Sequence, residues 1–65
     1  MEAWQERVVQ EKVELDVKLE KLNNFLNSPD PGISGEDFKL LLDQRHFMSR
    51  YSEVLGLRIA RFGTE

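Results

Sequence analysis

The segment Asn-Ser-Pro-Asp-Pro-Gly at residues 27–32 decides the fold of this 65-residue chain. Proline cannot continue a helix and also restricts the residue before it, so this segment ends any helix that reaches it. The chain on both sides has apolar residues at helical spacing, and a short loop between two long helices gives an antiparallel pair. The sequence therefore predicts an all-α, two-helix hairpin in one domain, residues 1–65, with helices over 2–27 and 35–62 and a loop over 28–34.

The start of the second helix has the clearest local signal. Ser34 can cap the helix, and Asp37 supplies a carboxylate three residues later, as in a capping box. Gly63 is placed to end this helix. Gly56 lies inside it, where glycine costs roughly 1 kcal/mol relative to alanine. Close approach of a neighbouring group and simple tolerance are both open explanations for Gly56.

The first helix carries apolar residues on two sides. One stripe can pack on the second helix, and it contains Trp4, Val8, Leu15, Leu19, Leu22 and Leu26. A second stripe lies almost opposite and has no partner in so short a chain, and it contains Val9, Val13 and Val17. The apolar arc of the second helix is also wider than one facing helix needs, because Leu40, Phe47 and Val54 extend it. We therefore expect a homo-oligomeric helical bundle with interface residues Val9, Val13, Val17, Phe47 and Val54.

Size and composition exclude several classes of protein. A chain this small buries too little surface to be comfortably stable alone. It has no cysteine and one histidine, so we expect no disulfide, no metal and no cofactor. No apolar run approaches the roughly 20 residues of a membrane span, and no signal-peptide pattern opens the chain. We expect a cytoplasmic protein that contacts no membrane and is not an enzyme, because no catalytic motif is present.

Two charged residues interrupt the apolar stripes. Folding the hairpin about its loop places Glu11 roughly level with Tyr51, and Arg58 roughly level with Trp4, where it can form a cation–π contact. Three interpretations stay open. The two residues can fix the register inside an oligomer, form the floor of a ligand pocket between chains, or lie exposed at the edge of the stripe.

Positive charge is concentrated in the second helix. Residues 44–63 contain four arginines and a single acidic residue, Glu53. Arginine suits bidentate phosphate contacts, and aromatic rings can stack on a base. The candidate ligand-binding residues are Trp4, Arg7, His46, Arg50, Tyr51, Arg58 and Arg61. The competing interpretation is a solvated face that pairs with acids such as Glu14, Asp16 or Glu20. Duplex DNA binding is disfavoured, because basic residues are not in excess.

Two stretches carry a resemblance to a family. Residues 4–16, residues 18–22 and Phe25 resemble the first helix of a family of very short phage and prophage accessory proteins, and residues 48–59 resemble the second helix. This resemblance implies a phage origin and residence in the cytoplasm of the bacterial host. In size and architecture the chain is also similar to phage hairpin oligomers that sequester nucleotide immune signals, which is a likeness of fold rather than of motif.

A second resemblance concerns the end of the chain. Residues 59–63 look like the end of the second helix of the plasmid Rop protein, a hairpin dimer that binds paired RNA loops. Three functions follow. The first is a phage-encoded binding protein that counters host defence by sequestering an anionic nucleotide-type signal at sites between subunits. The others are an inhibitor that docks an apolar helix face on a host protein, and a Rop-like RNA-binding dimer.

Overall fold

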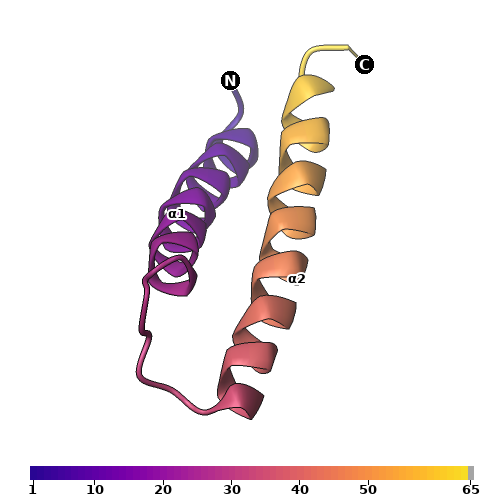
Figure 1. Ribbon diagram of the computed structural model, residues 1–65. Coiled ribbons are helices and arrows are strands. Elements are labelled where there is room, and N and C mark those ends of the chain that lie inside the picture. Colours follow the sequence, from indigo (N-terminus) through magenta and orange to yellow (C-terminus); the bar gives the residue numbers. More distant parts are fainter. Residues whose placement is uncertain (65) are drawn as a thin grey trace.

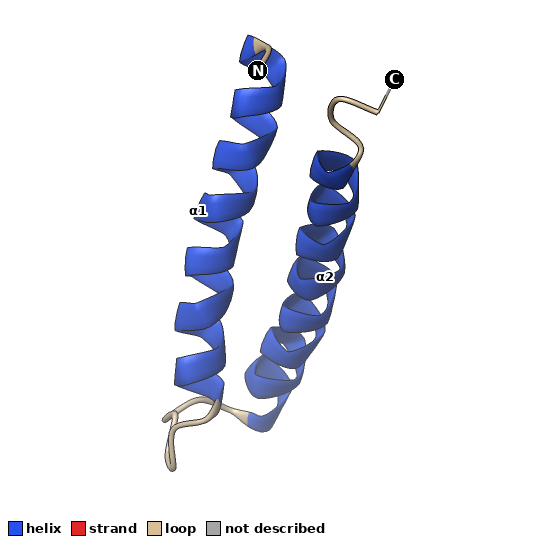
Figure 2. Cartoon of the chain, turned by 90° about the horizontal axis from the view of Figure 1, so that it is seen from above, coloured by secondary structure: helices blue, strands red, loops and turns tan. Residues whose placement is uncertain are grey.

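The computed structural model describes residues 1–64 and shows two antiparallel helices. Helix α1 spans Ala3–Leu26 and helix α2 spans Gly35–Ala60, against expected ranges of 2–27 and 35–62. The loop brings α2 back along α1, so both termini lie at the same end of the molecule (Figure 1). A second view shows that irregular structure is confined to the loop and the two ends (Figure 2). The predicted all-α hairpin is confirmed, with dimensions of 47 × 15 × 14 Å.

Local hydrogen bonds fix the boundaries of both helices. The Ser34 side chain accepts a hydrogen bond from the backbone N–H of Asp37 at 3.2 Å, which confirms the predicted cap. In the loop, Asp30 accepts a hydrogen bond from the N–H of Gly32 at 3.1 Å, and Gly32 has a positive φ of 71°. Gly63 has a φ of 84° just after α2, a conformation that favours glycine and ends the helix.

The core is a single seam between the helices. We call it the inner seam, and its most buried side chains are Val8, Leu26, Ser52 and Leu55. Leu55 is completely buried, with an exposed fraction of 0%. Half-buried side chains from both helices extend the seam along the hairpin, among them Leu15, Leu19, Leu22, Leu41, Met48 and Ile59. These positions are spaced by three, four or seven residues, as expected for one face of a helix packed on another.

Apolar side chains also remain outside this seam. Phe47 is 69% exposed, and large fractions of Leu40, Leu57 and Val13 are exposed as well. One layer of contact between two helices cannot cover them all. Within residues 1–64, neither helix is long and apolar enough to cross a membrane.

Candidate functional site

A polar cluster joins the two helices at the middle of the inner seam. The Lys12 ammonium donates hydrogen bonds to Ser52 Oγ at 2.7 Å and to Asp16 Oδ2 at 3.0 Å. The Ser52 hydroxyl in turn donates to Asp16 Oδ1. Each of the three groups therefore contacts the other two, and no buried polar side-chain atom in the described part of the chain lacks a partner.

Helix periodicity explains why these residues meet. Lys12 lies seven residues after Gln5 and seven before Leu19, so it belongs to the row that faces α2. Its hydrocarbon stem passes over Gly56, where an added Cβ would lie 3.5 Å from Lys12 Cε. A Cβ at that distance makes ordinary van der Waals contact, so of the two explanations for Gly56 the structure supports simple tolerance.

The cluster shifts the acidity of Asp16. The hydrogen bond from Ser52, aided by the hydrogen bond and charge of Lys12, lowers the pKa of Asp16 below its ordinary value of 3.8. These effects outweigh burial, which acts in the opposite direction. The carboxylate is therefore ionised near neutral pH and holds the other two side chains in place.

Glu11 and Arg58 are both exposed in the single chain, so neither belongs to the inner seam. The interpretations that place them inside an oligomer or at a pocket between chains stay predictions. Arg58 was expected to lie level with Trp4 along the hairpin axis, and this expected alignment is wrong by about one helical turn. The Trp4 ring instead meets Phe62 edge to face, with ring centroids 5.2 Å apart. Sequence reasoning missed Lys12 and Ser52, although the seven-residue row through Lys12 gave the necessary signal.

The open end of the hairpin carries both aromatic and cationic residues. Trp4 is in the first turn of α1, and its ring packs on Phe62 just beyond α2. Arg7 is exposed one turn after Trp4, at a spacing that places both on neighbouring parts of the α1 surface. Arg58 occupies the last turn of α2, and Arg61 is its C-terminal cap residue. Four of the predicted ligand-binding residues therefore lie near the two chain ends.

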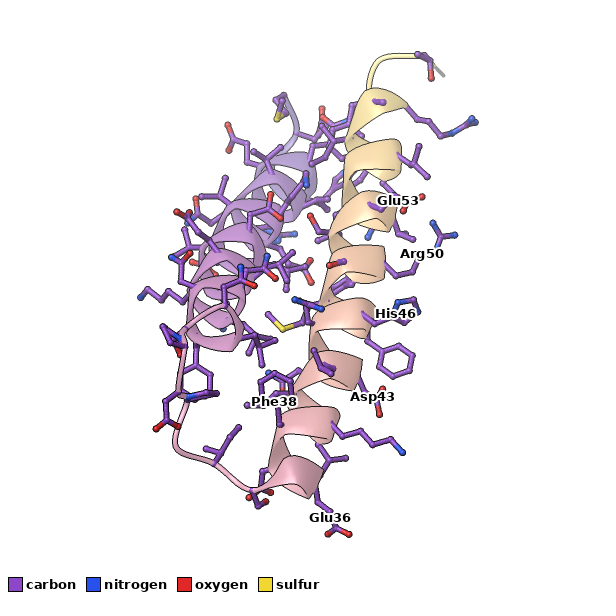
Figure 3. The ribbon with its side chains drawn as sticks, in the orientation of Figure 1. Glu36, Phe38, Asp43, His46, Arg50 and Glu53 are labelled. Carbon is purple, nitrogen blue, oxygen red and sulfur yellow. The ribbon has the colours of Figure 1, made fainter. Side chains whose placement is uncertain are left out.

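The remaining predicted ligand residues lie apart from this end. His46 and Arg50 point away from α1, along the outer side of α2 (Figure 3). The Arg50 guanidinium pairs with Glu53 at 2.6 Å, and the His46 ring lies beside Phe47, with centroids 5.5 Å apart. Tyr51 is partly exposed on α2. A single chain thus separates the seven residues into two groups.

The ion pairs show which arginines are available to a ligand. Among residues 1–64, salt bridges join Lys12 to Asp16 and Arg50 to Glu53. The arginines Arg50, Arg58 and Arg61 are exposed in the single chain, as the competing interpretation of a solvated face expects, but none of them pairs with Glu14, Asp16 or Glu20 among the described residues. Arg58 and Arg61 have no carboxylate partner in that range.

The predicted interface residues remain accessible in the single chain. Val13, Val17, Phe47 and Val54 are exposed and Val9 is half-buried. Their assignment to an oligomer interface stays a prediction.

These surfaces carry groups that can bind a phosphate or an aromatic base. Guanidinium groups can donate paired hydrogen bonds to phosphate, and the Trp4 ring offers a face for stacking. No group of three or more histidine, cysteine or acidic side chains within residues 1–64 is placed to hold a metal ion.

Comparison with known proteins gives one family assignment. No curated protein and no solved structure matches the chain. The model of a family described as Sequestin matches residues 2–61, which is nearly the whole hairpin, including both helices and the loop. The chain therefore belongs to the Sequestin family.

Proposed function

We propose that this protein is a binding protein that holds a small anionic molecule of nucleotide type in stoichiometric amounts, without converting it. The observation that carries the proposal is the open end of the hairpin, where the Trp4–Phe62 ring pair joins two chain segments that also carry the exposed residues Arg7 and Arg61. Exposed arginine beside an aromatic face is the combination that recognises a phosphate and a base together. The family name, Sequestin, fits a protein that sequesters its ligand.

The proposed site consists of two kinds of side chain, arginines that bind phosphate and an aromatic ring that stacks on a base. Arg7 and Arg61 would pair with phosphate oxygens, and neither has a carboxylate partner among residues 1–64. Trp4 is 43% exposed, so part of its ring is accessible for stacking while the rest packs on Phe62. The site proposed at the open end does not depend on the other predicted ligand residues, and ligand contacts of His46, Arg50, Tyr51 and Arg58 stay a prediction.

The biological setting we propose is a phage that counters host defence. Some bacterial hosts signal infection with a nucleotide. A protein that binds this nucleotide before the host's own receptor does so prevents the defence response. A small, abundant protein without turnover suits this task, because its effect depends on concentration and affinity alone. The resemblance of residues 4–16, 18–22, Phe25 and 48–59 to short phage accessory proteins supports this setting.

Thermal unfolding with a panel of ligands tests the proposal. Cyclic dinucleotides, cyclic trinucleotides and ADP-ribose derivatives are the probes, and one of them should raise Tm as its concentration increases. The bound molecule should be recovered chemically unchanged after the protein is denatured. A panel that leaves Tm unchanged would overturn the proposal, and recovery of a converted product would show an enzyme instead.

A matched pair of variants locates the site. Arg61→Ala should weaken binding roughly tenfold or more, since a hydrogen bond to a charged group contributes about 1.5–3 kcal/mol. Lys21→Ala removes the same charge near the loop, far from the open end, and should bind as the wild type does. Equal affinities for the two variants would place the ligand elsewhere.

A further inference from the structure

Helix α2 carries a second row of side chains that the hairpin leaves uncovered. We call it the outer seam, and it consists of Leu40, Phe47, Tyr51, Val54 and Arg58. Its spacings of seven, four, three and four residues place all five on one side of the helix, the pattern of a helix–helix contact. Each of these side chains is exposed in the single chain. The outer seam therefore has the periodicity of a packed face without a partner inside the molecule.

The amount of exposed surface matches one interface. The chain exposes 5070 Å², whereas a compact monomer of 7.6 kDa exposes roughly 4300 Å². The excess is about 800 Å², which is the area that each partner buries in a standard protein–protein interface. A second copy of the chain is an occupant of the right size.

Charge along the outer seam favours an antiparallel arrangement of the two copies. Glu36 and Asp43 lie beside the seam toward its N-terminal end, whereas Arg58 and Arg61 lie toward its C-terminal end. Parallel helices would place like charges side by side. Antiparallel helices place the arginines of one copy beside the carboxylates of the other, twice per dimer.

The surface near Glu36 has a shape that suits this pairing. An open hollow at the start of α2 is lined by Glu36, Lys39, Leu40 and Asp43. Glu36 and Asp43 lie on the side of α2 that faces away from α1 (Figure 3). Leu40 offers an apolar floor for the stem of an arginine, and the two carboxylates can accept hydrogen bonds from its guanidinium.

We propose that two copies of this chain pair through their outer seams in antiparallel orientation, so that Arg58 of each copy enters the hollow of the other. Phe47 then packs against Tyr51 of the partner subunit, and Asp43 pairs with the partner's Arg58. Arg50 takes no part in the ion pairs between the two copies, because its guanidinium already pairs with Glu53 of the same chain. The resulting four-helix assembly rests on surface and charge, and it forms without any nucleotide.

A charge exchange tests the pairing directly, by sedimentation equilibrium in the absence of nucleotide. The wild type should be a dimer, and Asp43→Arg or Arg58→Asp alone should raise its dissociation constant at least about tenfold. The double variant Asp43→Arg/Arg58→Asp should recover much of the lost affinity, because the pair is restored with its charges reversed. The control Glu20→Arg makes the same charge change on an exposed position of α1 and should leave the dimer unchanged.

Cross-linking tests the orientation independently. The chain has no cysteine, so Gln44→Cys introduces a single thiol beside the outer seam and Val54→Cys introduces one within it. In the antiparallel dimer these two positions face each other, whereas two copies of Cys at position 44 are about 15 Å apart along the axis and beyond disulfide reach. Oxidation should therefore link a mixture of the two variants and leave each variant alone unlinked.

Three outcomes would overturn this inference. They are a monomeric wild type, a double variant no stronger than the single variants, and disulfides that form within each cysteine variant alone. Nucleotide binding at Trp4, Arg7 and Arg61, none of which belongs to the outer seam, is measured separately through Tm. Failure of the dimer and failure of the proposed binding function are thus distinguishable.

Discussion

The two faces of α2 have similar periodicity but opposite surroundings in the single chain. On the inner seam, Leu55 is completely buried and Ser52 bonds to two side chains of α1. On the outer seam, Phe47 is 69% exposed and Arg58 has no carboxylate partner among residues 1–64. Helical spacing thus identifies the faces of α2 that are able to pack. It does not identify the partner of each face, which depends on whether another segment of the chain lies against that face.

The largest expected effect comes from the inner seam. Leu55→Ala should lower the free energy of unfolding by about 2–5 kcal/mol, because it leaves a cavity at the most buried position. Urea denaturation followed by circular dichroism measures the change. Phe47→Ala is the matched comparison on the outer seam, and its cost should grow with protein concentration, since only a paired copy covers Phe47. A concentration-independent loss of similar size in both variants would remove the distinction between the two faces.

A smaller effect of opposite sign is expected at Gly56. Gly56→Ala should stabilise the hairpin by up to about 1 kcal/mol, because alanine favours a helix interior over glycine. The added methyl group would meet Lys12 Cε at 3.5 Å, an ordinary van der Waals distance. The urea midpoint should therefore rise. A lower midpoint would show that the Lys12 side chain cannot adjust and that glycine is required beneath it.

The smallest effect concerns pH and the polar cluster. Since the pKa of Asp16 is lower in the folded chain than its ordinary value of 3.8, the carboxylate stabilises the fold above that value. This contribution is lost as the pH falls through the lower, folded pKa. Asp16→Asn should be less stable than the wild type near neutral pH, and the difference should shrink in strong acid. Urea midpoints for both proteins between about pH 7 and about pH 2 measure this convergence. A difference that stays constant over this range would contradict the assignment.

Much of the fold could be predicted because its signals are local. The two prolines, the Ser34 cap and the apolar spacing each act within a few residues, and they determine where the helices begin and end. The alignment of one helix against the other depends on contacts across the hairpin. The path of the loop in space determines which residues of α2 lie level with Trp4. That path could not be read from the loop sequence, so the contact of Trp4 with Phe62 rather than Arg58 was not predicted.

The candidate site was harder to predict for the same reason. Lys12 was not expected in the seam because its charge suggests an exposed residue, yet its stem packs over Gly56 while its ammonium reaches Ser52. Glu11 was expected in the seam because it fills a gap in the apolar stripe, yet it is exposed. Glu11 and Lys12 are adjacent in sequence, and the seven-residue row through Gln5 and Leu19 is the signal that selects Lys12.

The contact between Trp4 and Phe62 gives this protein a built-in optical probe of its two ends. Trp4 is the sole tryptophan, so all indole emission originates at the open end of the hairpin. Fraying of that end would change the emission while the middle of the hairpin is still folded, whereas circular dichroism averages over both helices. Comparing the two signals during heating would separate loosening of the ends from unfolding of the core. It would do so in the unmodified chain, without a dye.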